Sequence, residues 1–334
     1  MTTLDSVPVI DASKLPGASA LRAIDHACRD WGFFQVVNHG IDGEAILALQ
    51  REMRAFFDLP LDVKRLVERS ADNPWGFYDR ELTKNTRDWK QIFDCGPEDD
   101  PALRTPWPAG SPEFRPALRG FAHACEGLAF RLLAAISLNL GMPAHHLAGG
   151  FRPLHTSFLR LNYYPVCPEP ALPTSVQTPD RGHLGVNHHT DAGALTLLLQ
   201  DDVPGLEVHR EGRWHLVEPR SDALVINIGD IVQVWSNDRY RAALHRVRAS
   251  ADRVRYSAPF FFNPAYDTRY APLPTTCGAG SPARYRPIRW GEFRSLRAAG
   301  DYRDCGEEVQ IDHYRIENTG AGTSPPEEAS HGIH

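Results

Sequence analysis

Between Leu195 and Phe262 the chain repeats one pattern, in which a short apolar, β-rich segment is followed by a turn. Residues typical of turns, such as Pro204-Gly205 and Glu211-Gly212, separate the segments. Many short strands at even spacing are typical of a sandwich or a barrel. This half of the chain therefore predicts a β core. The strands that we expect span residues 195–199, 206–210, 214–217, 223–228, 231–235, 245–247 and 256–262.

The N-terminal half shows helical periodicity instead. Apolar residues recur every three or four positions from Leu21 to Trp31 and from Ile46 to Phe57, as on the buried face of a helix. A longer stripe runs from Phe114 to Ile136, and Ser111 followed by Pro112 predicts its N-terminal cap. Further strands are expected at 7–10, 33–37 and 158–164, whereas 73–97 is rich in aromatic residues without a clean period. The expected fold class is mainly β with flanking helices.

At 334 residues the chain has room for one large β core and its helices. We find no run of about 18 to 20 apolar residues and no basic segment followed by an apolar one at the N-terminus, so we expect a cytoplasmic protein without a membrane partner. The net charge of −6, with Lys and Arg scattered among acids, argues against a nucleic-acid partner. The six cysteines form no C-x-x-C pair, which predicts reduced thiols.

The motif with the clearest chemical meaning is His189-Thr190-Asp191. Side chains alternate along a strand, so in a strand from 188 to 200 His189 and Asp191 would share a face. His245 lies on a later β-rich segment and could supply a third ligand from another strand of the same sheet. Two histidines and one carboxylate suit non-haem Fe(II) oxygen chemistry. The alternative is a chance match, because His-x-Asp is a short pattern and the chain has 15 histidines.

A second constellation follows in Arg255-Tyr256-Ser257, where Arg255 and Ser257 share one strand face and Tyr256 points away. A guanidinium fork beside a hydroxyl is suited to holding a carboxylate. The alternative places Arg255 on a solvated sheet edge, as one of five nearby arginines. The apolar run from Ala258 to Phe262 favours a buried strand, in which an arginine needs an anionic partner because an unpaired buried charge is costly.

These motifs belong to an ordered set that covers nearly the whole chain up to about Tyr314. The set comprises Asn162-Tyr163-Tyr164-Pro165, His189-Thr190-Asp191, Leu195-Thr196-Leu197-Leu198, Asn227-Ile228-Gly229-Asp230, Ser236-Asn237, His245-Arg246-Val247 and Arg255-x-Ser257, preceded by Val7-Pro8-Val9-Ile10-Asp11, Trp31-Gly32-Phe33-Phe34 and Val37-Asn38-His39-Gly40. In this order the motifs resemble the Fe(II)/2-oxoglutarate-dependent dioxygenases of the isopenicillin N synthase-like family.

The resemblance implies a double-stranded β-helix, a jelly-roll core of the cupin type, wrapped by N-terminal and C-terminal helices. It divides the chain into an N-terminal helical and mixed region at 1–150, the core at 151–264 and a C-terminal helical lid segment at 265–317. Residues 318–334 are expected to form a disordered tail, because they are rich in Gly, Pro, Ser and Glu.

The resemblance also implies the site residues and the reaction. Fe(II) would be bound by His189, Asp191 and His245, which are the catalytic residues. Arg255 and Ser257 would hold the distal carboxylate of 2-oxoglutarate, assisted by Asn162 and Tyr164, while Phe261 either contacts a small-molecule substrate or packs in the core. With O2, such an enzyme hydroxylates or otherwise oxidises an unactivated C–H bond and releases succinate and carbon dioxide.

Two alternatives accompany this expectation. One is an iron oxidase on the same scaffold that does not consume 2-oxoglutarate, as in isopenicillin N synthase or aminocyclopropane carboxylate oxidase. The other is a non-catalytic relative that binds a metal or a ligand. All three metal positions and both carboxylate-binding positions are present in this chain, which favours an enzyme.

Overall fold

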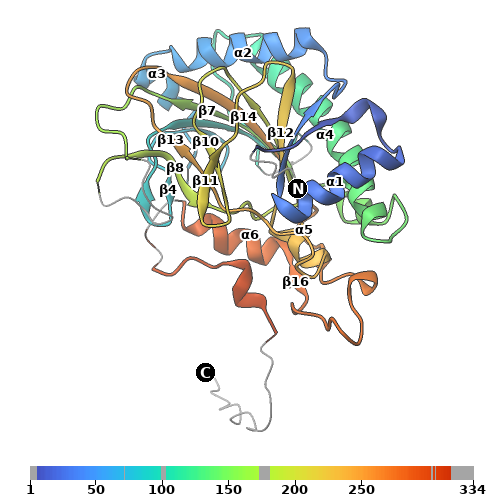
Figure 1. Cartoon of the computed structure of the whole chain (residues 1–334). Coiled ribbons are helices and arrows are strands. Elements are labelled where there is room, and N and C mark those ends of the chain that lie inside the picture. Colours follow the sequence, from blue (N-terminus) through green and yellow to red (C-terminus); the bar gives the residue numbers. More distant parts are fainter. Residues whose placement is uncertain are drawn as a thin grey trace, which may run out of the picture.

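A computed structural model of the chain describes residues 6–70, 72–98, 103–172, 181–301, 304 and 306–316. Two β-sheets face each other at its centre, and helices lie outside them (Figure 1). The large sheet has eight strands in the order β1-β2-β12-β9-β14-β7-β6-β3, and the small sheet has four in the order β11-β10-β13-β8. This is a jelly roll of the double-stranded β-helix type, so the predicted fold class is confirmed.

The described strands are β1 Val9–Asp11, β2 Phe33–Val37, β3 Gly76–Tyr78, β4 Leu82–Thr83, β5 Thr86–Arg87, β6 Gln91–Cys95, β7 Phe158–Tyr164, β8 Leu184–His189, β9 Leu195–Gln200, β10 Leu206–Arg210, β11 Arg213–Leu216, β12 Ala223–Ile228, β13 His245–Arg248, β14 Arg255–Phe262, β15 Arg269–Tyr270 and β16 Ile288–Arg289. The α-helices are α1 Ala18–Asp30, α2 Gly43–Phe57, α3 Leu61–Arg65, α4 Phe114–Asn139, α5 Asp230–Trp235 and α6 Trp290–Ala299. Short 3-10 turns span Ala12–Lys14, Leu147–Phe151, Pro274–Thr276 and Ile311–Tyr314.

The large sheet is buried on both faces, which explains why its strands are continuous apolar runs. Along β9, Leu197 and Leu199 point to the cluster under the helices, whereas Leu198 points to a smaller cluster between the two sheets. Burial of both faces hides the alternation of apolar and polar residues that marks a half-exposed strand. The small inter-sheet cluster leaves room at one end for polar side chains, and the candidate site lies there.

Helix α4 supports the large sheet from outside, packing on β7, β9 and β14 and against α1 and α2 (Figure 1). By length and composition α4 could cross a membrane, which corrects the expectation that no stretch of the chain could. Half of its most apolar window is buried, and its apolar residues belong to the main core, so we interpret it as a core helix. It begins at Phe114 without a side-chain cap, so the cap predicted at Ser111 was wrong.

One predicted strand is a helix. Residues 231–235 lie in α5, which begins directly after Gly229, and all six of its residues are buried. A short apolar run that is buried all round gives no period by which a strand and a helix can be distinguished.

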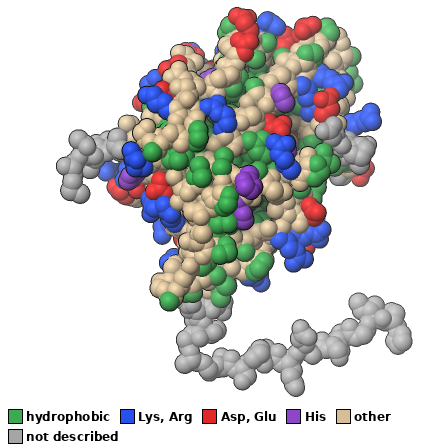
Figure 2. All heavy atoms as spheres, turned by 90° about the vertical axis from the view of Figure 1, so that its right-hand side faces the viewer, with side chains coloured by type: hydrophobic (Ala, Val, Ile, Leu, Met, Phe, Trp, Pro, Cys, Tyr) green, Lys and Arg blue, Asp and Glu red, His purple; other side chains and the backbone are tan. Residues whose placement is uncertain are grey.

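The predicted division of the chain at 150/151 and 264/265 stays a prediction, and β1, β2, β3 and β6 from the first segment join the large sheet. The predicted tail at 318–334 lies outside the described residues. Figure 2 shows the face that carries α1 and α4, where basic and acidic side chains are interspersed without a stripe of one sign. The described cysteines are all free thiols.

Candidate metal centre and cosubstrate pocket

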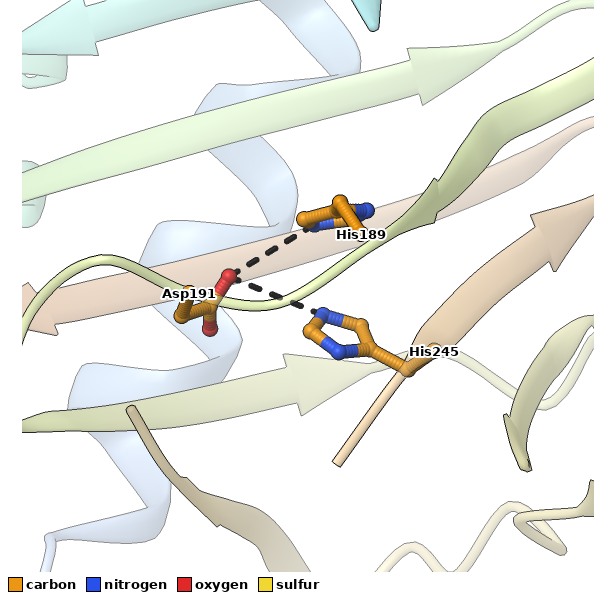
Figure 3. Close-up of side chains that lie close together, drawn as sticks. All are labelled: His189, Asp191 and His245. Atoms are coloured by element: carbon orange, nitrogen blue, oxygen red, sulfur yellow. Dashed lines mark ion pairs between the residues drawn. The ribbon is translucent and has the colours of Figure 1, made fainter. Parts of the chain in front are cut away.

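Three side chains from two strands and a turn converge at the open end of the sheets (Figure 3). His189 ends β8 and His245 begins β13, and these two residues lie opposite each other in the antiparallel pair. Asp191 follows β8 by two residues, and its Oδ1 lies 3.5 Å from Nε2 of His189 and 3.6 Å from Nε2 of His245. One ligand atom from each residue falls within 4.8 Å of the others. This group of two imidazoles and one carboxylate can hold a single metal ion.

Both imidazoles are oriented by backbone carbonyl groups. Nδ1 of His189 lies 2.8 Å from the Asn187 carbonyl oxygen, and Nδ1 of His245 lies 3.0 Å from that of Ala243. A carbonyl oxygen can only accept, so Nδ1 carries the proton and the lone pair of Nε2 faces Asp191. Burial and the neighbouring His189 lower the pKa of His245 to about 4, which keeps it a neutral ligand at physiological pH.

The protein donates hydrogen bonds to only one of the two carboxylate oxygens of Asp191. Its Oδ2 accepts hydrogen bonds from the Thr196 hydroxyl and, at 2.7 Å, from the Asn227 side-chain amide, while Oδ1 faces the two histidines. Burial alone would raise the pKa of Asp191, but the two neighbouring imidazoles and the hydrogen bond from Thr196 outweigh it and hold the pKa well below its usual value. The carboxylate is thus ionised, with one oxygen directed at the metal position.

The route by which Asp191 reaches this position differs from the prediction. The chain is not one strand from 188 to 200, because β8 ends at His189 in the small sheet and β9 begins at Leu195 in the large sheet. Asp191 lies in the crossing between the sheets. A Cβ on Gly229 would come within 2.7 Å of the Asp191 carbonyl oxygen, so glycine is required where α5 begins beside this crossing.

A second polar group lies on the inner face of the large sheet, where β7 and β14 pair with Asn162 opposite Ser257 and Tyr164 opposite Arg255. The Ser257 hydroxyl lies 3.3 Å from the Asn162 amide nitrogen and 3.5 Å from the Tyr164 hydroxyl. Arg255 stands over the Tyr164 ring at 5.0 Å. The four residues that the resemblance assigns to 2-oxoglutarate therefore form one patch.

Arg255 is 2% exposed, which excludes the solvated sheet edge. Its Nε donates to the Val203 carbonyl oxygen at 3.2 Å and its Nη2 to the Gln200 side-chain oxygen at 3.1 Å. Within the described residues, Nη1 of Arg255 and Oδ1 of Asn162 are buried without a hydrogen-bond partner. A buried guanidinium with neutral partners and one unused nitrogen fits a carboxylate ligand such as that of 2-oxoglutarate.

Phe261 occupies the far end of this inner face. It stacks on Phe158 with ring centroids 4.8 Å apart, and both rings line a cavity of about 230 Å³ that also touches His189 and Asp191. No sequence motif pointed to the other lining residues, which include Arg160 on β7 and Arg294 and Arg297 on α6. Their role depends on contacts between distant segments, which a linear pattern does not reveal.

Comparison with known proteins gives the family. Residues 155–264 match the model of the 2OG-Fe(II) oxygenase superfamily, and residues 7–116 match that of the non-haem dioxygenase in morphine synthesis N-terminal region. Jasmonate-induced oxygenase 4 of Arabidopsis thaliana is 35% identical over 299 residues, which is 87% of this chain and 81% of that protein. The chain therefore belongs to the 2OG-Fe(II) oxygenase superfamily, in its isopenicillin N synthase-like branch.

Solved structures of related proteins have the same fold as this chain. The structure of JOX2 in complex with 2OG, Fe and JA superimposes with a TM-score of 0.80 at 30% identity, covering 93% of this chain and 89% of that one. A Neurospora crassa enzyme in complex with alpha-KG and thymine gives a TM-score of 0.77 at 27% identity, covering 88% and 96%. This chain is thus a 2-oxoglutarate-dependent dioxygenase that uses Fe(II), 2-oxoglutarate and O2, as predicted.

Proposed function

We propose that His189, Asp191 and His245 bind the Fe(II) and leave its remaining positions open to cosubstrate, oxygen and substrate. The observation that carries this assignment is the convergence of three ligand atoms within 4.8 Å, with both Nδ1 atoms already committed to carbonyl groups. His188 is excluded as a ligand, because it is not part of this group.

Arg255, with Ser257, Asn162 and Tyr164, would hold the distal carboxylate of 2-oxoglutarate. When bound, Fe(II) and 2-oxoglutarate supply the activation of O2, coupled to decarboxylation of the cosubstrate to succinate. The protein contributes the fixed orientation of its ligands and a charge partner at Nη1 of the buried Arg255.

The substrate we propose is a small organic molecule whose C–H bond is hydroxylated or otherwise oxidised. Support comes from the cavity of about 230 Å³ beside the metal position, with Phe261 as a substrate contact. The related structures hold JA or thymine, both small molecules. A cytoplasmic location stays a prediction, which cell fractionation would test.

The assignment is tested by Asp191→Ala, with His188→Ala as the matched control on the same strand end. We expect Asp191→Ala to lose stoichiometric iron and all substrate-dependent succinate formation, because two histidines alone hold Fe(II) weakly. His188→Ala should retain both. Unchanged iron content and turnover in Asp191→Ala would show that this carboxylate is not a ligand.

Stoichiometry separates the proposed reaction from the oxidase alternative. A screen of small organic molecules with the iron-loaded protein should find substrates that trigger succinate formation in proportion to oxidised product. Oxidised product without succinate would favour the oxidase that does not consume 2-oxoglutarate. Iron and 2-oxoglutarate binding without any oxidised product would favour the non-catalytic relative.

A further inference from the structure

The cavity beside the metal position contains two kinds of cation. Three are neutralised by carboxylates in the wall formed by β6, β7 and the segments that precede β4 and β6: Arg160 pairs with Asp94 at 2.7 Å, Lys90 with Glu81 at 2.6 Å, and Arg69 with Glu81 at 3.4 Å. The other two, Arg294 and Arg297, come from α6. They lie three residues apart and therefore on one face of the helix.

Neither α6 arginine has a carboxylate within 4.0 Å among the described residues. Arg294 donates from Nη1 to the Thr156 carbonyl oxygen at 3.0 Å. Arg297 donates from Nη1 to the Val309 carbonyl oxygen at 3.2 Å and from Nη2 to the Thr190 carbonyl oxygen at 2.8 Å. Carbonyl groups orient a guanidinium but do not neutralise it, so both arginines keep their charge and several unused N–H groups.

The acidic residues of the cavity do not supply the missing charge. Asp94 is paired with Arg160, and Asp301 and Glu308 line the same cavity without forming an ion pair with either α6 arginine. Asp94 and Asp301 act on Arg294 only from beyond ion-pair distance. A half-buried guanidinium pair with neutral partners is costly unless an anion joins it.

The two guanidinium groups are also held in place. Arg294 lies among Tyr266, Phe158 and Trp75, with distances of 5.4, 5.5 and 5.8 Å from its Cζ to the ring centroids. The carbonyl group that holds Arg297 belongs to Thr190, between two residues of the metal group. An anion bound by this pair would therefore sit beside the metal position at a fixed distance from it.

We propose that Arg294 and Arg297 bind a carboxylate group of the substrate, so that the oxidised molecule is a small organic acid. This inference rests on the proposed function, because it assigns the cavity beside the metal position to substrate. Planar guanidinium groups match the two oxygens of a carboxylate, and the small cavity limits the rest of the molecule.

The test compares small carboxylic acids with their uncharged primary amides, which have nearly the same shape. The probes are phenylacetate with phenylacetamide, hexanoate with hexanamide and cyclohexanecarboxylate with its amide. Calorimetric titration into the anaerobic protein with Fe(II) and 2-oxoglutarate should show at least one acid bound roughly tenfold or more tightly than its amide. Equal binding within every pair would overturn the proposal.

Variants then locate the preference. Arg294→Gln and Arg297→Gln should each weaken binding of the acid by roughly 10- to 100-fold and leave the amide unchanged. Arg297→Lys should recover part of the acid affinity, because it restores the charge without the fork. The matched control is Arg289→Gln, at the N-terminus of the same helix, where Arg289 is 48% exposed and pairs with Glu292. Unchanged acid preference in both Gln variants would overturn the assignment.

Failure of this inference can be distinguished from failure of the proposed function. Affinities for iron and 2-oxoglutarate should be the same in wild type, Arg294→Gln and Arg289→Gln, because neither arginine contacts the metal group or the Arg255 patch. Arg297→Gln also removes the hydrogen bond to Thr190, so this variant is judged by its ratio of acid to amide affinity. Loss of acid preference with intact iron and 2-oxoglutarate binding rejects only the arginine pair. The same titrations can be made on the metal-free protein, where an acid preference is also expected.

Discussion

Two arginines on paired strands of the large sheet, Arg160 and Arg255, have opposite surroundings. Arg160 on β7 donates to both oxygens of Asp94, at 2.7 and 2.8 Å, and to Glu81 at 2.9 Å. Arg255 on β14 donates only to neutral oxygens, and its Nη1 has no partner in the described part of the chain. Because β7 pairs directly with β14, both arginines belong to the same inner face.

The difference separates a structural cation from a binding cation. The charge of Arg160 is balanced inside the protein, so its removal should affect folding. No carboxylate among the described residues forms an ion pair with Arg255, so its charge is available to an anion from outside, such as the carboxylate of 2-oxoglutarate. The residue type is the same in both cases and both side chains are mostly buried, so the ion-pair partners are what distinguishes them.

The largest expected effect concerns Arg160, whose charge is balanced by carboxylates of the protein. Arg160→Met would leave Asp94 and Glu81 short of their main partner in a buried wall. We expect the free energy of unfolding to fall by about 3–5 kcal/mol, as measured by urea denaturation without ligands. The control Arg253→Met removes an exposed pair with Asp202 and should leave the unfolding midpoint unchanged. An Arg160 variant as stable as wild type would mean that this pairing does not distinguish the two arginines.

The second expected effect concerns Arg255, which has no ion-pair partner among the described residues, and the affinity for 2-oxoglutarate. Arg255→Gln should raise the Kd of 2-oxoglutarate roughly 30- to 100-fold, about 2–3 kcal/mol, because a charge-assisted interaction is lost. Stability without 2-oxoglutarate should not fall, since no internal ion pair is broken. Arg255→Lys should lie between wild type and the Gln variant. An unchanged 2-oxoglutarate titration with a large loss of stability would reverse the roles assigned to the two arginines.

The sequence predicted those parts of the molecule whose signal is local. Strands β2, β7, β10 and β12 have the bounds that their apolar runs predicted, and the helical stripes gave α1, α2 and α4. His-x-Asp and Arg-x-Ser pointed to side chains that the structure brings together with His245 and with Asn162 and Tyr164, because the residue types themselves suit the chemistry. The geometry expected for Asp191 was wrong, since a crossing between sheets, and not strand alternation, brings it beside His189 and His245.

The sequence could not predict the charged wall. Strands β3 to β6 lie in the segment that showed no clean period, and the buried charged side chains on these strands or directly before them include Glu81, Lys90 and Asp94. Such residues are usually exposed, so they conceal a buried strand unless their partners are known. Arg160 lies 66 residues from Asp94 and 79 from Glu81, a separation that local patterns do not bridge.

Asp191 is an intermediate case, since the protein satisfies one of its oxygens and leaves the other to the metal. Thr196→Val removes the hydroxyl donor to Oδ2 while keeping nearly the same shape. We expect the Kd of Fe(II) to rise about tenfold, because the carboxylate loses a partner that orients it. Stability of the metal-free protein should change little. A competition titration with a chelator measures the affinity, and an unchanged Kd would show that Asn227 alone fixes the carboxylate.

The smallest expected effect concerns a carboxylate beside the balanced wall. Three cations, Arg69, Lys90 and Arg160, already match three carboxylates, Glu81, Asp88 and Asp94. Asp301 is a fourth carboxylate, and burial followed by the charge of Glu81 raises its pKa to about 7. A raised pKa in the folded state means that the stability contribution is present below the ordinary value of 3.8 and is lost as the pH rises through 7.

Asp301→Asn, which mimics the protonated form, should therefore match wild type most closely below about pH 4 and exceed its stability increasingly towards pH 8, by an amount on the order of 1 kcal/mol. Urea denaturation of both proteins across this range measures the difference, and the exposed Asp267→Asn serves as the control. Parallel pH profiles of the Asp301 variant and wild type would show that the wall accommodates a fourth charge. In that case the internal carboxylates would not fully balance the positive charge around Arg160, and Arg160 and Arg255 would differ only in the degree of that balance.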